Sequence, residues 1–318
     1  MRNAAQDRRT LMALVVVGSV ALDDVYTETE QRTGILGGSA SYFSMGASVL
    51  TDVKVVAVVG DDFPDEYVEL YRTRNVDTEG LVKKTGKTFH WAGRYSADFS
   101  TRTTLATDLN VFAEFDPKLP NSYRTASHVF LGNIEPGLQH KVLDQLESPL
   151  FVAADTMNYW IDHSFDRLMA LLPRLDMLLI NDEEARLLGR SSSLTAAAKK
   201  ILALGPKSIV VKRGEHGASL YHEKGSFFLP AFPVKQVADP TGAGDSFASG
   251  FMGYLAGRVP GTPSFEDLKQ ALAVGTAVAS FTVEHFSLDG LLHLDANKIL
   301  ERYQTLLDLV HIDPITTL

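Results

Sequence analysis

The sequence predicts an α/β protein of three layers, in which a mostly parallel central sheet lies between two layers of helices and a small separate β-sheet is attached. Short apolar runs alternate with segments of helical period, which is typical of β-α-β units around a buried parallel sheet. Two other stretches alternate like antiparallel strands. The chain of 318 residues is long enough for one large α/β domain.

Six continuous apolar runs are the predicted strands of the main sheet, because strands covered by helices on both faces need apolar side chains on both. They occupy residues 13–19, 53–60, 127–133, 149–155, 176–181 and 208–214. The segments between and after these runs have the spacing of helices. The predicted helices occupy residues 39–50, 64–74, 136–147, 164–173, 182–188, 195–204, 243–257, 265–285 and 295–310.

Two stretches, 24–36 and about 86–115, are rich in Thr or aromatic residues and have the alternation of antiparallel strands. They predict a small sheet that stands off the main body. The sequence has no internal repeat and no low-complexity linker. We therefore expect one domain over residues 11–318 that carries this small sheet.

The apolar run at 11–22 is predicted to be a buried strand, and residues 1–10 are expected to be a disordered lead-in. Gly18 and Ser19 interrupt the run, and two aspartates follow it at once. It has no signal-peptide cleavage site and is shorter than the ~20 apolar residues that cross a bilayer. The sequence therefore predicts no membrane partner.

The composition excludes several classes of function. There are 30 Lys and Arg against 39 Asp and Glu, which gives a net charge of −9. Nucleic acid is not an expected partner, because binding along its phosphates requires an excess of positive charge. The absence of cysteine excludes disulfides, Cys-ligated zinc, iron–sulfur clusters and thiol catalysis. A cytoplasmic location fits this composition.

The strongest chemical signal is the string DPTGAGD at 239–245, where a glycine-rich loop enters a helix. Glycines let the backbone approach an anion, and the N–H groups and dipole of a helix N-terminus attract it. Asp245 at the rim of such an anion hole would accept a proton from an attacking hydroxyl. Alternatively, Asp245 only complements the helix dipole, worth about 0.3–1 kcal/mol, and the glycines only form a turn.

Residues 239–245 and the small-residue helix after them resemble the C-terminal signature of the ribokinase-like sugar kinases, also called the PfkB carbohydrate kinase family. Other segments match the family's motifs in the family's order. They are GSVALD at 18–23, LGGSASYF at 36–43, NDEEARLL at 181–188 and VKRGEHGASLY at 211–221. The resemblance covers roughly residues 13 to 310 and implies the ribokinase-like fold. It also implies that the small sheet is a lid over the substrate, which often forms a dimer contact.

The resemblance implies an ATP-dependent kinase of a hydroxyl on a small sugar or nucleoside. Asp245 would be the catalytic base. The backbone amides of Gly242, Ala243 and Gly244 would hold the charge that develops during phosphoryl transfer, a reaction that depends mainly on alignment and charge stabilisation.

The resemblance also implies metal ions. Asn181 and Glu184 would hold Mg²⁺ through its waters, since this ion stays largely hydrated when it bridges phosphates. The same two residues have the spacing of a helix capping box, and both interpretations can hold. Asp239 would lie near a monovalent cation such as K⁺ in members that bind one.

On the nucleotide side, Gly214, Gly217 and Thr241 would border ATP. Lys212 and Arg213 have two interpretations: contacts to phosphate, or solvated charges of a loop.

On the substrate side, Asp23, Gly37 and Gly38 match family positions that contact the substrate. Tyr42 stands where many of these sugar kinases have Asn, so it either stacks on the substrate or packs in the core. Ala21 stands where ribokinase has Asn, which disfavours ribose bound as in ribokinase.

The acceptor stays open between a sugar and a nucleoside. The segment DTMNYW at 155–160 lacks the ending seen in fructokinase-like members, which disfavours fructose. Aromatic residues of the lid either cover a nucleobase or pack on each other; they are Phe89, Trp91, Tyr95 and Phe99. A second hypothesis is a regulatory protein that binds a nucleotide or sugar on this fold without turnover. The joint presence of Asp245, the glycines and the Asn181/Glu184 pair favours the kinase.

Overall fold

The structure is a computed structural model that describes residues 13–99 and 101–313. The expected lead-in at 1–10 lies outside the described residues. Within these ranges, the main sheet has nine strands. They are β1 (Leu14–Val17), β4 (Val53–Val59), β5 (Val76–Lys83), β8 (His128–Leu131), β9 (Phe151–Asp155), β10 (Met177–Asn181), β11 (Ser208–Lys212), β12 (Ala218–His222) and β13 (Gly225–Leu229).

The main sheet is mostly parallel, as predicted. Its strand order is β13-β12-β11-β10-β9-β8-β1-β4-β5, and only β12 runs antiparallel to its neighbours β11 and β13. All six predicted strands are present. The strands from β11 to β5 therefore end at the same edge of the sheet, which is where parallel α/β sheets place their ligands.

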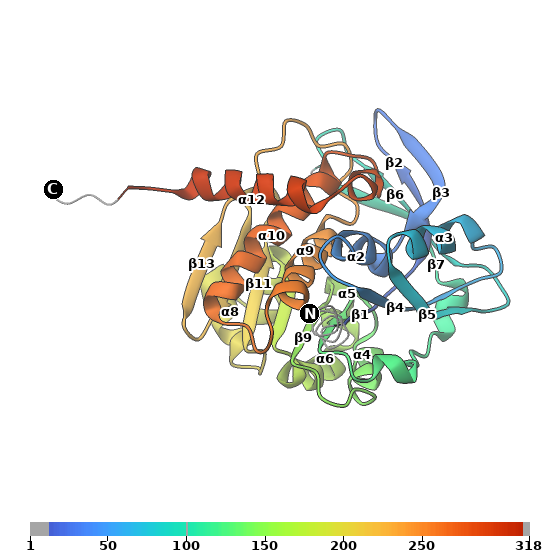
Figure 1. Cartoon of the computed structure of the whole chain (residues 1–318), viewed down its shortest axis with the longest axis horizontal. Coiled ribbons are helices and arrows are strands. Elements are labelled where there is room, and N and C mark those ends of the chain that lie inside the picture. The colour runs from blue at the N-terminus through green and yellow to red at the C-terminus, as the bar shows by residue number, and fades with distance from the viewer. Residues whose placement is uncertain (1–12, 100, 314–318) are drawn as a thin grey trace, which may run out of the picture.

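Helices cover both faces of the main sheet (Figure 1). One layer contains α2 (Ser39–Ala47), α3 (Asp65–Thr73), α9 (Ala243–Arg258), α10 (Phe265–Val283), α11 (Asp289–Leu292) and α12 (Ala296–Val310). The other contains α4 (Pro136–Leu143), α5 (Asn158–His163), α6 (Phe165–Leu171), α7 (Asp182–Gly189) and α8 (Leu194–Leu202). Each of the nine predicted helices is found, and none of the described helices is long and apolar enough to cross a membrane.

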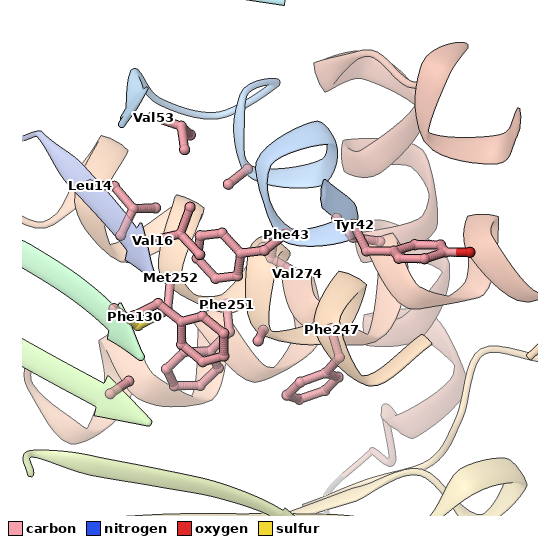
Figure 2. Close-up of a cluster of buried hydrophobic side chains, with 14 of the residues drawn as sticks. Leu14, Val16, Tyr42, Phe43, Val53, Phe130, Phe247, Phe251, Met252 and Val274 are labelled. Atoms are coloured by element: carbon pink, nitrogen blue, oxygen red, sulfur yellow. The ribbon is translucent and has the colours of Figure 1, made fainter. Parts of the chain in front are cut away.

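The side chains of β1 show how the sheet builds two cores. Leu14 and Val16 pack into the layer of α2, α9 and α10, whereas Val15 and Val17 pack against the opposite layer. This alternation follows from the two-residue period of a strand. Figure 2 shows the first core, where Phe43 of α2 stacks on Phe130 of β8 with 4.4 Å between ring centres.

The separate small sheet consists of β2 (Ala21–Tyr26), β3 (Gln31–Gly37), β6 (Phe89–Tyr95) and β7 (Arg102–Asp108), in the order β3-β2-β6-β7. Both predicted stretches contribute to it. The outer pairs, β3 with β2 and β6 with β7, are antiparallel, whereas the central pair of β2 and β6 is parallel. The sheet lies on the side of the main sheet where β4 and β5 are, with β2, β3 and β6 at the upper right of Figure 1.

Candidate active site

The turn before α9 presents free backbone N–H groups at the edge where the parallel strands end. Gly242 has a left-handed backbone conformation, with φ +72°, and directly precedes the helix. Among the described residues, the N–H groups of Gly242 and Gly244 have no backbone acceptor, whereas that of Ala243 donates to the Pro240 carbonyl at 3.2 Å. Two of the three predicted amides are thus free to bind an anion at the positive end of the helix dipole.

Tyr42 packs against the back of this turn. A Cβ atom on Gly242 would lie 2.2 Å from the Tyr42 ring. The ring is 2% exposed, and its hydroxyl donates a 3.4 Å hydrogen bond to the Ser287 hydroxyl. Figure 2 shows Tyr42 directed away from Phe43 on the same helix, with its hydroxyl turned out of the apolar cluster. The structure therefore favours the interpretation that Tyr42 packs in the core, where its ring contacts Gly242 and supports the turn.

Asp245 lies in the first turn of α9 and is half-buried. Burial and the charge of Asp155 raise the pKa of Asp245 from its ordinary 3.8 to about 7, while the Lys212 ammonium opposes this rise. A carboxyl group that titrates near neutral pH is well suited to accept a proton from an alcohol.

Lys212 and Asp155 form an ion pair beside the turn. The Lys212 Nζ atom lies 3.0 Å from Asp155 Oδ2, and the two side chains are 17% and 8% exposed. Nζ would lie 3.1 Å from a Cβ atom on Gly244, so the ammonium is directed at the anion hole. Burial lowers the pKa of Lys212, but the carboxylates of Asp155, Glu184 and Asp245 outweigh this and raise it. The interpretation of Lys212 as a solvated loop charge was therefore wrong.

Asn181 and Glu184 form the capping box that their spacing predicts. The Glu184 N–H donates to Asn181 Oδ1, and the Asn181 N–H donates to Glu184 Oε2, both at 2.8 Å. Glu184 is 7% exposed. Burial and the nearby Asp155 raise its pKa to about 7, against the opposing effect of Lys212.

This arrangement fits a hydrated Mg²⁺. The second carboxylate oxygen of Glu184 does not take part in the capping box. A cation near this oxygen would stabilise the ionised form of the Glu184 side chain. No cluster of three His, Asp or Glu side chains able to hold a metal occurs among the described residues. An ion at this edge would therefore take most of its ligands from phosphates and water, as Mg²⁺ commonly does.

Asp239 and Thr241 connect the loop before α9 to its surroundings. Asp239 is fully buried and accepts the N–H groups of Thr241 at 2.8 Å and Ser287 at 3.0 Å. The Thr241 hydroxyl donates to the Tyr95 hydroxyl of β6 at 2.9 Å. The small sheet therefore contacts the loop that forms the anion hole.

The predicted substrate residues lie where β2, β3 and α2 meet. The Asp23 carboxylate occupies the space beside Gly37, since a Cβ atom there would lie 1.9 Å from Asp23 Oδ2. Gly38, with φ +88°, precedes α2 and passes close to the Ser19 carbonyl. Burial raises the pKa of Asp23 to about 7, although the Gly38 N–H and His90 lower it.

The two predicted nucleotide glycines lie in the turn after β11. Gly214 is exposed, and a Cβ atom there would contact nothing within 4 Å. Gly217 is buried, and a Cβ atom there would lie 2.0 Å from the Leu229 carbonyl oxygen. Gly214 is thus open to a ligand, whereas Gly217 is required by the close approach of β13.

The strand ends therefore bring together Asp155, Glu184, Lys212 and Asp245. The sequence analysis did not predict Asp155 as a site residue. Its position could have indicated such a role, because Asp155 ends a predicted parallel strand and Asn181 ends the next predicted strand along the chain. A surface cavity of about 490 Å³ lined by Asp116, Lys141 and neighbouring residues contains none of these groups; we place the chemistry at the strand ends because the free N–H groups and buried charges are there.

These groups form a candidate anion site, with a carboxyl group and an ammonium beside it, on a mostly parallel α/β sheet. The chain matches the family described as pfkB family carbohydrate kinase over residues 13–292 and belongs to that family. The family assignment inferred from the motifs is thus confirmed, and with it a phosphotransferase that uses an alcohol as acceptor.

Two similar proteins are named as kinases of nucleosides. The cytidine kinase of Thermococcus kodakarensis is 29% identical over 256 residues, which cover 78% of this chain and 90% of the relative. The nucleoside kinase of Methanocaldococcus jannaschii is 24% identical over 287 residues, 85% of this chain and 90% of the relative.

Solved structures confirm the ribokinase-like fold. The M. jannaschii nucleoside kinase, titled an archaeal member of the ribokinase family, superposes with a TM-score of 0.75 at 19% identity, covering 92% of this chain and 98% of the other. The nucleoside kinase of Burkholderia thailandensis in complex with ADP-inosine gives a TM-score of 0.78 at 16% identity, covering 93% and 96%.

Proposed function

We propose that this chain is an ATP- and Mg²⁺-dependent kinase that phosphorylates a hydroxyl of a nucleoside. The observation that carries the proposal is the set of groups at the start of α9, where the free N–H groups of Gly242 and Gly244 lie beside Asp245 and the ammonium of Lys212. Together they offer an anion site, a base and a positive charge, which are the parts that phosphoryl transfer requires.

In the proposed reaction, Asp245 takes the proton of the acceptor hydroxyl. The oxygen forms a bond to the γ-phosphorus of ATP while the bond from that phosphorus to the β–γ bridging oxygen breaks, and ADP leaves with the electron pair. The N–H groups of Gly242 and Gly244 stabilise negative charge on the transferred group. Lys212, Gly214 and Thr241 border the nucleotide in this proposal, and Gly217 allows the turn after β11 to lie close to β13.

The proposal assigns the ions to two places. Asn181 and Glu184 would hold Mg²⁺ through water, and the ion would neutralise phosphate charge. Asp239 would lie near a monovalent cation such as K⁺.

The acceptor would bind where the small sheet meets α2, against Asp23, Gly37 and Gly38. The small sheet would act as a lid that excludes water, which competes with the acceptor hydroxyl. In a homodimer, it would also form the contact between copies. Tyr42 would act by supporting Gly242 at the boundary between the two substrates.

A nucleoside is favoured over a simple sugar by two observations. Three of the similar proteins, which match 78–85% of this chain, are named cytidine or nucleoside kinases. In the structure, Trp91, Tyr95 and Phe99 gather in one cluster of the small sheet, and Tyr95 contacts Thr241 of the loop. Phe89 lies outside this cluster, because its ring stacks on that of Phe112.

Release of ADP tests this function directly. A panel of nucleosides and sugars is incubated with ATP and Mg²⁺, and ADP is measured above the rate of ATP hydrolysis without acceptor. We expect acceptor-dependent ADP with nucleosides, cytidine and inosine among them. ADP release with sugars alone would overturn the nucleoside assignment. Binding in a thermal-shift screen with no ADP from any member would favour the regulatory protein instead.

Replacing Glu184 by Gln should raise the Mg²⁺ concentration for half-maximal activity by about 10-fold or more. The amide can still accept the Asn181 N–H, so the capping box and the fold should be retained, while the negative charge near the metal is lost. A magnesium titration of the initial rate measures this. The matched control is Asp267→Asn in the capping box of α10, formed with Ser264, which should leave the magnesium requirement unchanged. An unchanged requirement in Glu184→Gln would limit Glu184 to a capping role.

A further inference from the structure

Two hydrogen bonds join the small sheet to the part of the main body that surrounds the turn before α9. The Thr241 hydroxyl donates to the Tyr95 hydroxyl at 2.9 Å, and Tyr95 is the last residue of β6. On β3, the Arg32 guanidinium donates to Asp289 at 2.8 Å and lies 4.9 Å from the centre of the Phe286 ring. The small sheet is therefore held against this part of the main body at two points.

The segment 286–289 connects the contact of Arg32 to the turn. The Ser287 N–H donates to Asp239 Oδ2 at 3.0 Å, and the other carboxylate oxygen of Asp239 accepts the Thr241 N–H at 2.8 Å. Ser287 has φ +53°, a left-handed conformation that is uncommon for residues other than glycine and persists where surrounding contacts fix it. The small sheet thus reaches the turn through the main body as well as directly.

The direct contact is made by a buried side chain. Tyr95 is 7% exposed, and its ring packs with Val25 and Phe286 while its hydroxyl bonds to Thr241. Thr241 immediately precedes Gly242, whose N–H group has no backbone acceptor among the described residues. A shift of Thr241 therefore changes where this N–H group points. The Tyr95 hydroxyl fixes one side of the turn from a different sheet.

The predicted acceptor residue Asp23 lies on the strand next to that of Tyr95. Asp23 is in β2, which pairs with β6 along its whole length. In this pairing Asp23 lies opposite Trp91, four residues before Tyr95. The hydrogen bonds of the ladder keep the two strands at a fixed spacing. A ligand bound to Asp23 therefore restricts the position of Tyr95.

We propose that Tyr95 is a positioning residue that links acceptor binding to the nucleotide site, because it holds Thr241 where the N–H group of Gly242 can bind the terminal phosphate of ATP. This inference rests on the proposed function, since it takes the acceptor to bind against Asp23. An acceptor that holds the small sheet in place then raises the affinity for ATP. ATP raises the affinity for the acceptor by the same factor, because coupling between two binding sites is reciprocal.

The variant Tyr95→Phe tests this inference, because it removes the hydroxyl and keeps the ring with its apolar contacts. The dissociation constant of an ATP analogue with an uncleavable β–γ bridge is measured by calorimetry with Mg²⁺, with and without saturating cytidine or inosine, whichever releases more ADP. In the wild type, the nucleoside should lower this constant by about 5- to 10-fold. In Tyr95→Phe it should lower the constant by less than about 2-fold. The variant's kcat should fall about 10-fold, while its affinity for the nucleoside alone stays within about 2-fold.

Two controls separate this effect from a general loosening of the small sheet. Tyr67 of α3 also joins this sheet to the main body, since its hydroxyl donates to the Gly34 carbonyl of β3 at 3.3 Å, but it does so at α3 instead of at the turn. Tyr67→Phe should therefore keep the wild-type coupling. At the other end of the tested bond, Thr241→Ser keeps a hydroxyl and should keep the coupling, whereas Thr241→Val should lose it.

The outcomes distinguish this inference from the function on which it rests. A wild-type protein without acceptor-dependent ADP release would overturn the proposed function. An active wild type in which the nucleoside leaves the affinity for the analogue unchanged would overturn the inference alone, as would full coupling in Tyr95→Phe or an equal loss in Tyr67→Phe. If Tyr95→Phe does not fold, Thr241→Val decides, since full coupling in that variant contradicts the role of the bond.

Discussion

Replacement of Asp245 by Asn should lower kcat by about 10²–10⁴-fold while ATP affinity changes by no more than a few-fold. Asn keeps the size of the side chain but cannot take a proton from the acceptor hydroxyl. In the proposed site, ATP is bound mainly by the N–H groups of Gly242 and Gly244 and by Lys212, all of which the variant retains. Initial rates at saturating ATP and acceptor, together with calorimetric titration of the nucleotide, measure the two quantities separately.

A measurement of thermal stability checks that the Asp245→Asn variant is folded. In the ligand-free protein, the pKa of Asp245 is raised from 3.8 to about 7. This carboxyl therefore costs the folded state stability as the pH rises between these values. The variant should accordingly be at least as stable as the wild type at pH 8. Asp166→Asn, an exposed aspartate in the first turn of α6, should leave kcat unchanged. Equal losses of ATP binding and turnover would make Asp245 a helix cap.

Replacement of Gly242 by Ala should reduce kcat/KM by at least about 10²-fold and lower the melting temperature. The residue has φ +72°, a conformation that costs an L-residue about 1–2 kcal/mol. In addition, the new Cβ atom would lie 2.2 Å from the ring of Tyr42, which is buried and cannot move aside freely. The turn must shift, and its N–H groups then no longer point at the phosphate. Steady-state kinetics and thermal unfolding of the same preparation measure both effects.

Gly34 offers a matched control for this clash. It has a similar φ of +65°, but a Cβ atom there would meet nothing within 4 Å. Gly34→Ala should therefore show only the conformational cost, about 1 kcal/mol of stability, with normal turnover. If Gly242→Ala turned over ATP and acceptor at the wild-type rate, the turn would not be the phosphate site.

The strands of the main sheet could be predicted where both faces are buried, and they were missed where they are not. The runs that contain β1, β4 and β10 are mostly apolar because helices cover them on both sides. In β5, at one edge, only Val76 and Gly80 are buried, so its pattern is mostly polar. The hairpin of β12 and β13 forms the other edge and follows directly from the loop after β11, where the sequence resembles a nucleotide-binding segment.

The site residues could be predicted from the sequence where they lie close together in one short segment. DPTGAGD places the turn, the amides and Asp245 within seven residues, and Asn181 and Glu184 form a local capping box. The ion pair between Asp155 and Lys212 joins residues that are 57 positions apart. It depends on the order of β9, β10 and β11 in the sheet, which no single segment of the sequence encodes.

The structure of the protein with a nucleoside and an ATP analogue whose β–γ bridge cannot be cleaved tests the central claim most directly. We expect the terminal phosphate on the N–H groups of Gly242 and Gly244, and an oxygen of the nucleoside about 2.6–3.2 Å from a carboxylate oxygen of Asp245. A terminal phosphate bound away from this turn, or Asp245 directed away from the nucleoside, would contradict the account.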